Sequence, residues 1–168
     1  MWVVGSVCVV LLVLTTVIHY EVLRALTVGL PRFRIPARSK LIVVILGAFV
    51  AHAVEIVLYA LAIYLLVRHQ GFGTLGDVNN FSPTVALYFS AETYTSLGYG
   101  DVVPGGDLRL VAGVEPHHGL LLIGWSASYA YIAMERFWRD GGGKEAAATA
   151  QSGAAPASPP YSPPSTRH

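Results

Sequence analysis

Long apolar runs alternate with short polar segments along the chain, and three of these runs are long enough to cross a membrane. They occupy residues 1–23, 41–67 and 108–138. A transmembrane helix needs about 20 mostly apolar residues, so each run predicts one membrane-spanning helix. The first run lacks the basic start and the small-residue cleavage site of a secretory signal, and we expect it to be retained as an N-terminal transmembrane helix.

A fourth apolar stretch, residues 81–94, is too short to cross a membrane and too apolar for an ordinary loop. It opens with Ser82 and Pro83, a favoured helix cap followed by a favoured first helical residue, so we predict a short helix over 83–95. Two closely spaced glycines then end this helix. Irregular backbone at membrane depth is tolerated only where it is packed in protein or lines a water-filled path. The segment therefore predicts a re-entrant loop.

Composition narrows the class of protein. The 168 residues are 54% hydrophobic and only 12% charged, against about 25% charged residues in soluble domains. We therefore expect an all-α membrane protein that is not an enzyme. A net charge of +1 provides no basic surface for nucleic acid. The single cysteine, Cys8, allows neither an internal disulfide nor a cysteine zinc cluster.

Basic residues between the first two runs predict how the chain lies in the membrane. The predicted loop 24–40 carries no acidic residues and five basic ones: Arg24, Arg32, Arg34, Arg38 and Lys40. Short loops rich in Lys and Arg stay on the cytoplasmic side, so we expect the N-terminus outside and the C-terminus inside the cell (inner) membrane. The tail 139–168 is rich in Gly, Ala, Ser and Pro, and we expect it to be a disordered cytoplasmic segment.

The most specific motif follows the start of the short helix. Residues 86–104, ALYFSAETYTSLGYGDVVP, strongly resemble the pore helix and selectivity filter of potassium channels. The resemblance is closest to the small prokaryotic, KcsA-like channels with a two-helix pore, and we expect a pore domain over residues 41–138. The first span lies outside this resemblance as an extra N-terminal transmembrane helix. Alone, the four residues Gly-Tyr-Gly-Asp would be a weak match, but the preceding apolar helix and the flanking spans favour a filter over a plain turn.

The resemblance implies a filter over residues 96–101, in which four chains surround one axis and bind K+ through backbone oxygens. The implied ligands are the carbonyls of Ser96, Leu97, Gly98 and Tyr99, with the Ser96 hydroxyl innermost. Glycine reaches backbone conformations closed to other residues, so Gly98 and Gly100 let consecutive carbonyls face one side. Ser96 and Leu97 stand where the family usually has threonine and valine or isoleucine, which leaves a weakly selective cation channel as an alternative.

Four residues are implied to support the filter: Tyr88, Glu92, Thr95 and Asp101. By resemblance, Glu92 and Asp101 approach each other behind the filter and share a proton, because two adjacent carboxylates do not both ionise easily. The family's tryptophan pair is replaced by Tyr88 and Phe89, so a tyrosine hydroxyl is the only aromatic donor expected near Asp101. The Tyr99 ring is expected to point outward against pore-helix aromatics.

The third apolar run matches the family's inner helix if one residue is deleted after Pro104. This register places Gly119 at the position of the gating hinge, and Pro116 removes a helical hydrogen bond and favours a kink just above it. One stripe of the helix then lines the cavity and forms the gate: Leu120, Ile123, Ala127 and Tyr131. A stripe of this spacing is also typical of plain helix packing.

Ionisable residues inside the predicted spans form two pairs with the same spacing. His52 and Glu55 lie on the second span, Glu115 and His118 on the third. Such groups cost several kcal/mol in a membrane unless they are paired, so we predict that the two pairs meet between these spans. They would form a structural network or, since histidine changes charge near neutral pH, a proton sensor. A metal site that also includes His117 is a weaker alternative.

These expectations describe a homotetramer in the lipid bilayer that conducts K+ passively and selectively and is a candidate for modulation by pH. We expect no cofactor, with K+ as the permeant ion, and no nucleic-acid partner. Three alternatives stay open: a non-conducting regulatory or assembly subunit with a channel-like fold, a weakly selective cation channel, and a metal transporter or membrane enzyme built on the His/Glu residues.

Overall fold

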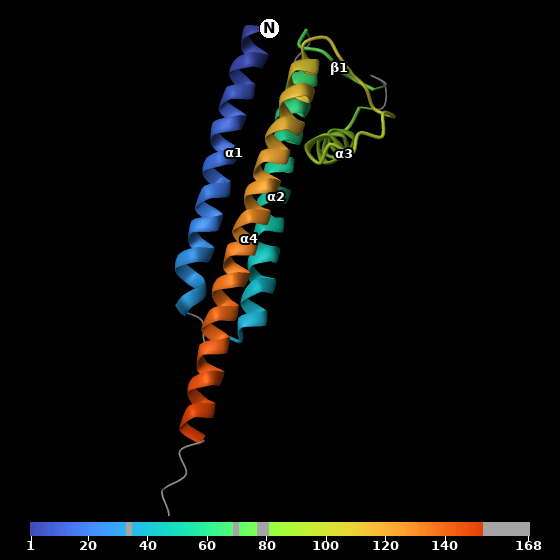
Figure 1. Ribbon diagram of the computed structural model, residues 1–168. Coiled ribbons are helices and arrows are strands. Elements are labelled where there is room, and N and C mark those ends of the chain that lie inside the picture. The colour runs from blue at the N-terminus through green and yellow to red at the C-terminus, as the bar shows by residue number, and fades with distance from the viewer. Residues whose placement is uncertain (33–34, 69–70, 77–80, 153–168) are drawn as a thin grey trace, which may run out of the picture.

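The computed structural model describes residues 1–32, 35–68, 71–76 and 81–152, and the chain is mostly helical. The elements follow in the order α1 (Trp2–Gly29), η1 (Leu30–Arg32), α2 (Ala37–Arg68), β1 (Thr74–Leu75), α3 (Pro83–Tyr94), β2 (Pro104–Gly105) and α4 (Leu108–Ser152). The long helices α1, α2 and α4 run side by side (Figure 1). The short helix α3 lies to one side of this bundle, in the half nearer the N-terminus.

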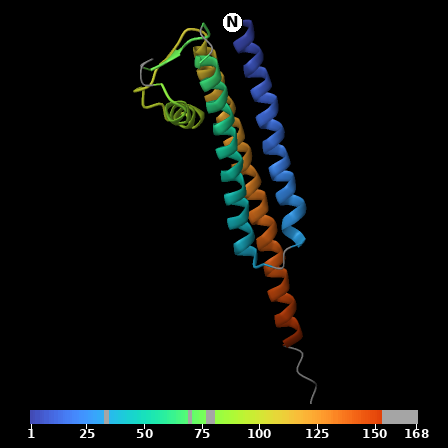
Figure 2. The same cartoon turned by 180° about the vertical axis from the view of Figure 1, so that it is seen from behind.

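One face of α1 is buried against the other long helices. Its buried residues recur every third or fourth position: Val4, Cys8, Leu11, Thr15, His19 and Leu23. This spacing is typical of a helix that packs along one stripe, and α1 packs against both α2 and α4. Figure 2 shows the same arrangement from behind.

Two helices of the described residues are long and apolar enough to cross a membrane, Trp2–Arg32 and Arg38–Arg68. Only 28% and 22% of their apolar windows are buried within the subunit, so most of their apolar side chains face outward. Exposed apolar surface of this extent is typical of a membrane or subunit interface. The third predicted span, in α4, is helical throughout, and its crossing of the membrane stays a prediction.

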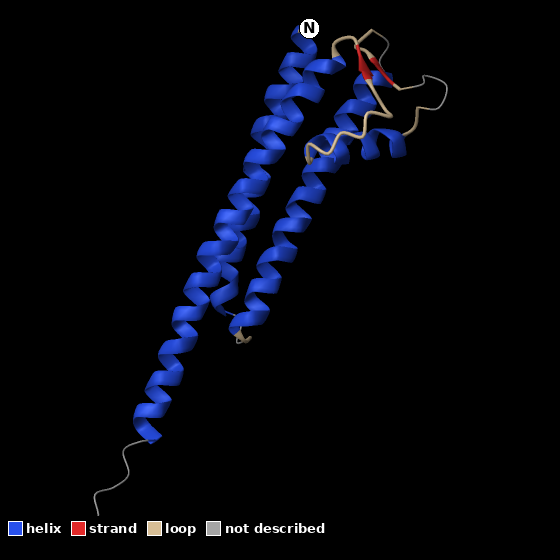
Figure 3. Ribbon diagram, turned by 45° about the vertical axis from the view of Figure 1, so that its right-hand side comes forward, coloured by secondary structure: helices blue, strands red, loops and turns tan. Residues whose placement is uncertain are grey.

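Ser82 and Pro83 begin α3. The Ser82 side chain accepts a hydrogen bond from the Val85 amide at 3.3 Å, and Pro83 occupies the start of the helix. The cap satisfies one free amide of the first turn, and the proline removes another. β1 and β2 pair antiparallel, with Thr74 opposite Gly105 (Figure 3). This pairing closes the segment that carries α3, which packs against α2 and α4.

The main hydrophobic core lies where α3 meets the bundle. Tyr59 of α2, Tyr94 of α3 and Leu108 of α4 are fully buried there. A second, smaller cluster of Leu30, Val44 and Ala133 joins η1, α2 and α4. The end of α3 is therefore fixed by side chains from several helices, which positions the segment that follows it.

The basic segment between the first two spans is more helical than expected. α1 continues to Gly29 and η1 to Arg32, where a loop was expected from residue 24. Residues 24–29 include good helix formers, and the first proline of the chain is Pro31, so nothing breaks the helix earlier. α2 likewise begins at Ala37 rather than at residue 41.

The helix α4 also exceeds its expected end. It continues to Ser152, whereas a disordered tail was expected from residue 139. Alanine has the highest helix propensity, and four alanines in residues 146–150 favour this continuation. Residues 153–168 of the expected tail, and Arg34 of the basic loop, lie outside the described residues.

Candidate functional site

The loop after α3 turns its amides toward Glu92 of α3. The amides of Leu97 and Gly98 donate to the Glu92 backbone carbonyl at 2.8 and 3.3 Å, and the Tyr99 amide donates to Glu92 Oε2 at 3.1 Å. In a trans peptide the N–H points away from the carbonyl of the preceding residue. The carbonyls of Ser96, Leu97 and Gly98 therefore all point away from α3.

Left-handed backbone at alternate positions produces this arrangement. Ser96, Gly98 and Gly100 have φ angles of 59°, 53° and 81°. Glycine adopts such angles freely, as the sequence analysis argued for the two glycines. Ser96 is the exception, because a side chain in this conformation costs about 1–2 kcal/mol. Sequence reasoning missed the conformation of Ser96, since the type of residue gives no sign of it.

The filter loop is exposed in the isolated subunit. Leu97 is 59% exposed and the Tyr99 side chain 69% exposed. Tyr99 was expected to pack against pore-helix aromatics, but its own subunit does not cover it. The carbonyls of this loop also face one side only. The loop is thus uncovered on the side that its carbonyls face.

The two acidic residues near the filter have separate hydrogen-bond donors. Glu92 is 5% exposed and accepts from the Tyr99 amide. The Asp101 carboxylate accepts from the Tyr88 hydroxyl, at 3.2 Å to Oδ1 and 3.1 Å to Oδ2. Among the described residues no hydrogen bond joins Glu92 to Asp101, so the expected shared proton is replaced by these two contacts. One oxygen of Glu92, Oε2, instead accepts from the backbone of the loop.

Thr95 closes α3 and takes no direct part in the filter. Its hydroxyl donates to the Ala91 carbonyl at 2.8 Å. The Thr95 backbone amide donates to the same carbonyl at 3.3 Å. A supporting role of Thr95 in the filter stays a prediction.

Gly119 packs against the end of α3. A Cβ at this position would overlap the backbone carbonyl oxygen of Tyr94, the last residue of α3. The glycine was predicted as a gating hinge, and its contact is a separate reason for a residue without a side chain. Pro116 lies inside α4, which is assigned as one continuous helix through that position.

The stripe of α4 that is predicted to line the cavity is only partly exposed. Leu120 is 53% and Tyr131 63% exposed, and Ala127 is exposed as well. Ile123 is half-buried and packs against the main core. Three of the four residues are thus exposed on the surface of the chain.

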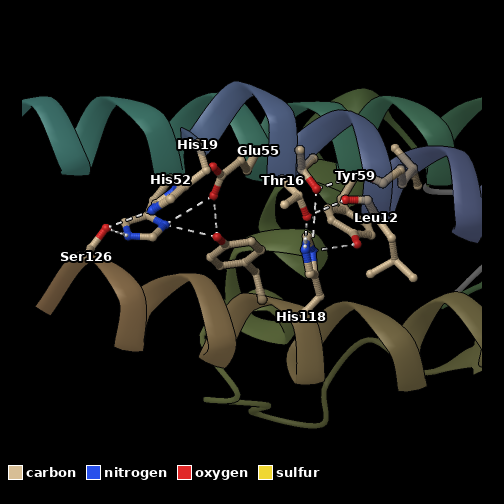
Figure 4. Close-up of polar contacts among 11 residues, drawn as sticks. Leu12, Thr16, His19, His52, Glu55, Tyr59, His118 and Ser126 are labelled. Carbon is tan, nitrogen blue, oxygen red and sulfur yellow. Dashed lines mark hydrogen bonds and ion pairs between the residues drawn. The ribbon is translucent and has the colours of Figure 1, made fainter. Parts of the chain in front are cut away.

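Behind the filter loop lies a group of polar side chains from four helices (Figure 4). His19 Nδ1 of α1 is 2.9 Å from Glu55 Oε1 of α2, and His52 Nδ1 is 3.2 Å from Glu55 Oε2. The Tyr94 hydroxyl donates to Glu55 Oε2. Ser126 Oγ of α4 is 3.1 Å from the Nε2 atoms of both histidines. His19, His52 and Glu55 present ligand atoms within 4.8 Å of one another and are the described group suited to a metal ion.

His118 belongs to a different group. Its Nε2 atom is 3.0 Å from the Thr16 hydroxyl, and its Nδ1 atom is 3.4 Å from that of Thr15 and 3.2 Å from that of Tyr59. Both threonines donate their own hydrogens to carbonyls one turn earlier. A neutral ring satisfies the two shorter contacts, because Nε2–H donates to Thr16 while Tyr59 donates to Nδ1.

Glu115 is fully buried beside Ser90 of α3. Ser90 Oγ contacts both Glu115 Oε1 and the Ile56 carbonyl. A serine has one hydrogen, so both contacts are satisfied only if Glu115 is protonated and donates to Ser90. Glu115 Oε2 has no hydrogen-bond partner in the described part of the chain, as suits a neutral acid better than a carboxylate.

The predicted meeting of the two His/Glu pairs is therefore wrong. His52 and Glu55 bind each other, but Glu115 and His118 have their own, separate partners. The reason is that α1 supplies Thr15, Thr16 and His19 to the interface, and α3 supplies Ser90. The predicted metal site of His52, Glu55, Glu115, His117 and His118 fails for the same reason, and His117 is exposed.

Sequence reasoning missed His19 altogether. The available signal was its spacing from Thr15, since polar residues four apart in an apolar helix lie on one face. Their burial depends on which helix covers that face, and this information is not local to α1.

Comparison with known families agrees with this geometry. The family model described as "Ion channel" matches residues 40–136, which is more than half of the chain. No curated protein and no solved structure matches the chain. The matched region includes α2, α3, the filter loop and the first part of α4. The chain belongs to the ion-channel family.

Proposed function

We propose that the chain forms a homotetrameric, potassium-selective pore that conducts K+ passively across the cell membrane. The observation that carries this proposal is the common direction of the Ser96, Leu97 and Gly98 carbonyls, whose following amides all bind Glu92. Rings of backbone carbonyls replace the hydration shell of K+ in filters of this kind. No cofactor is part of the proposal, and K+ is the permeant ion.

The position of α3 supports the same function. Its C-terminal end, at Tyr94, leads directly into the filter loop. Carbonyls at the end of a helix carry a partial negative charge, which stabilises a cation that has lost part of its water. The contact of Gly119 with the Tyr94 carbonyl fixes the distance between α4 and this end.

The proposed pore needs four copies because a single filter loop cannot enclose an ion. The exposed Leu97 and Tyr99 of the filter loop, and the exposed Leu120 and Tyr131 of α4, provide apolar surface for neighbouring subunits. Within the bilayer such surfaces associate mainly through close van der Waals packing. In the tetramer, Tyr99 packs against the pore helix of a neighbour and holds the filter at its diameter.

The proposed orientation places the N-terminus and the outer end of the filter on the same side. The amino group of Met1 pairs with Asp107, which lies between β2 and α4. Basic Arg32, Arg38 and Lys40 lie at the opposite end of α1 and α2, where positive residues favour the cytoplasm.

Flux through the purified chain in liposomes tests the function. Under a K+ gradient we expect K+ flux far above Na+ flux, with tetramers seen in native mass spectrometry. Equal fluxes of the two ions would instead support a weakly selective cation channel, attributable to Ser96 and Leu97. Intact tetramers without flux across a range of voltage and pH would overturn the proposal in favour of a non-conducting subunit.

A further inference from the structure

Three side chains with metal-binding atoms converge between α1 and α2, beside Tyr94 at the end of α3. His19 and Glu55 are fully buried, and the His52 side chain is 17% exposed. Each histidine turns its Nδ1 atom toward a different oxygen of Glu55, at 2.9 and 3.2 Å. Figure 4 shows the arrangement, with Ser126 on the far side of the rings.

The hydrogen atoms of this group do not suffice for its contacts. If both Nδ1 atoms donate to Glu55, both Nε2 atoms of the neutral rings are acceptors. Both face the Ser126 hydroxyl at 3.1 Å, which has one hydrogen to donate. One buried ring nitrogen is then unsatisfied, and the Glu55 carboxylate keeps an uncompensated charge. Both conditions are costly in a buried site.

A proton on one ring, or a metal cation among the three residues, removes this conflict. When both Nδ1 lone pairs bind the cation, each Nε2 atom carries a hydrogen, and the serine oxygen has two lone pairs to accept them. Histidines that bind metals usually donate their other N–H to a partner of this kind. The Tyr94 hydroxyl donates to Glu55 Oε2 and orients the carboxylate in the same way.

We propose that His19, His52 and Glu55 bind a divalent transition-metal ion of the Zn2+ class. Two imidazoles and a carboxylate are a common three-residue zinc ligand set, whereas Mg2+ and Ca2+ prefer oxygen ligands. Tetrahedral bonds of about 2.0–2.2 Å separate neighbouring ligands by about 3.3 Å. The two nitrogen–oxygen distances of 2.9 and 3.2 Å are close to this value.

The site would link the first span to the pore. His19 lies in α1, outside the region 40–136 that matches the ion-channel family. Glu55 binds Tyr94, the last residue of α3 before the filter loop. A bound ion thus ties α1 and α2 together next to the end of the pore helix. Its binding requires no conduction and is tested independently of flux.

Titration of the purified full-length protein with Co2+, which substitutes for Zn2+ and absorbs visible light when tetrahedral, tests the site. We expect one Co2+ per chain with a tetrahedral spectrum that Zn2+ displaces. His19→Gln and His52→Gln should each weaken binding about tenfold or more, and Ser126→Ala by about 10- to 100-fold. His117→Gln is the matched control, because this exposed histidine of α4 should leave binding unchanged.

Two results would overturn the proposal. Wild-type protein that binds neither Co2+ nor Zn2+ would show that a proton is the only cation held by the group. Unchanged affinity in His19→Gln would place the ion elsewhere. Should the histidine variants fail to fold, X-ray absorption of the Zn2+-loaded wild-type protein decides the matter. Two imidazoles and one carboxylate are expected, and any other ligand set contradicts the site.

Discussion

Gly119 of α4 lies directly against the backbone carbonyl of Tyr94, with no space for a side chain between them. Tyr94 ends α3 and precedes the filter loop, so this contact sets how closely α4 approaches the base of the filter. Backbone atoms on both sides prevent relaxation by a simple rotamer change. Close packing of α4 against the end of α3 therefore requires glycine at position 119. This requirement is independent of any bending of the helix.

Gly119→Ala should therefore destabilise the protein. A Cβ overlapping the Tyr94 carbonyl forces backbone shifts that typically cost about 1–3 kcal/mol. Gly113→Ala on the same helix is the control, because a Cβ there meets nothing within 4 Å. Thermal unfolding in detergent should show a lower midpoint for the first variant only. Equal midpoints would show that Gly119 serves bending alone.

Gly98→Ala should abolish K+ flux. Its φ of +53° disfavours any side chain, although a Cβ would meet no atom within 4 Å. Gly5→Ala is a matched control, since a Cβ at Gly5 also meets nothing within 4 Å but no left-handed backbone is involved. Flux assays on tetramers of both variants isolate the backbone conformation. Normal flux in Gly98→Ala would contradict the carbonyl filter.

Tyr88→Phe should make the outer end of the filter less stable. It removes the hydroxyl that donates to both oxygens of Asp101. We expect flux under a sustained K+ gradient to decay faster than in the wild-type protein. Tyr20→Phe removes an exposed hydroxyl from α1 and should not alter the decay. The account fails here if both variants behave alike.

Glu115→Gln should be tolerated despite complete burial of the side chain. The hydrogen count at Ser90 indicates a neutral acid, and a glutamine amide also donates to Ser90 Oγ in the same volume. We expect a loss of about 1 kcal/mol, because the amide brings one more hydrogen than the protonated acid into this buried site. Glu115→Ala, which leaves a cavity, should cost more. A large loss of thermal stability in Glu115→Gln itself would show that a carboxylate is required.

The filter segment was the part most open to prediction from sequence. The Ser82 cap, Pro83 and the two filter glycines are local signals, and the helix and loop lie where these signals place them. The backbone of Ser96 was not predictable, because its left-handed conformation is imposed by hydrogen bonds to α3. These hydrogen bonds close the end of the helix within six residues, at a position where glycine is the usual residue, so serine gives no sign of this conformation.

The buried polar groups were the part least open to prediction. Spacing along α2 correctly suggested that His52 and Glu55 interact. The partners of Glu115 and His118 depend instead on how α1 and α3 pack against α4, which no short segment encodes. His19 belongs to this group because α1 packs against α2 and α4. α1 lies outside the region that resembles potassium channels.

Diffraction from crystals in which Tl+ replaces K+ tests the central claim most directly. The account predicts anomalous density on a four-fold axis, ringed by the carbonyls of Ser96, Leu97 and Gly98, which turn away from Glu92. Gly98→Ala should remove or weaken these peaks. Ordered filter loops with no Tl+ on the axis, or Tl+ held only by the Glu92 or Asp101 carboxylates, would contradict it.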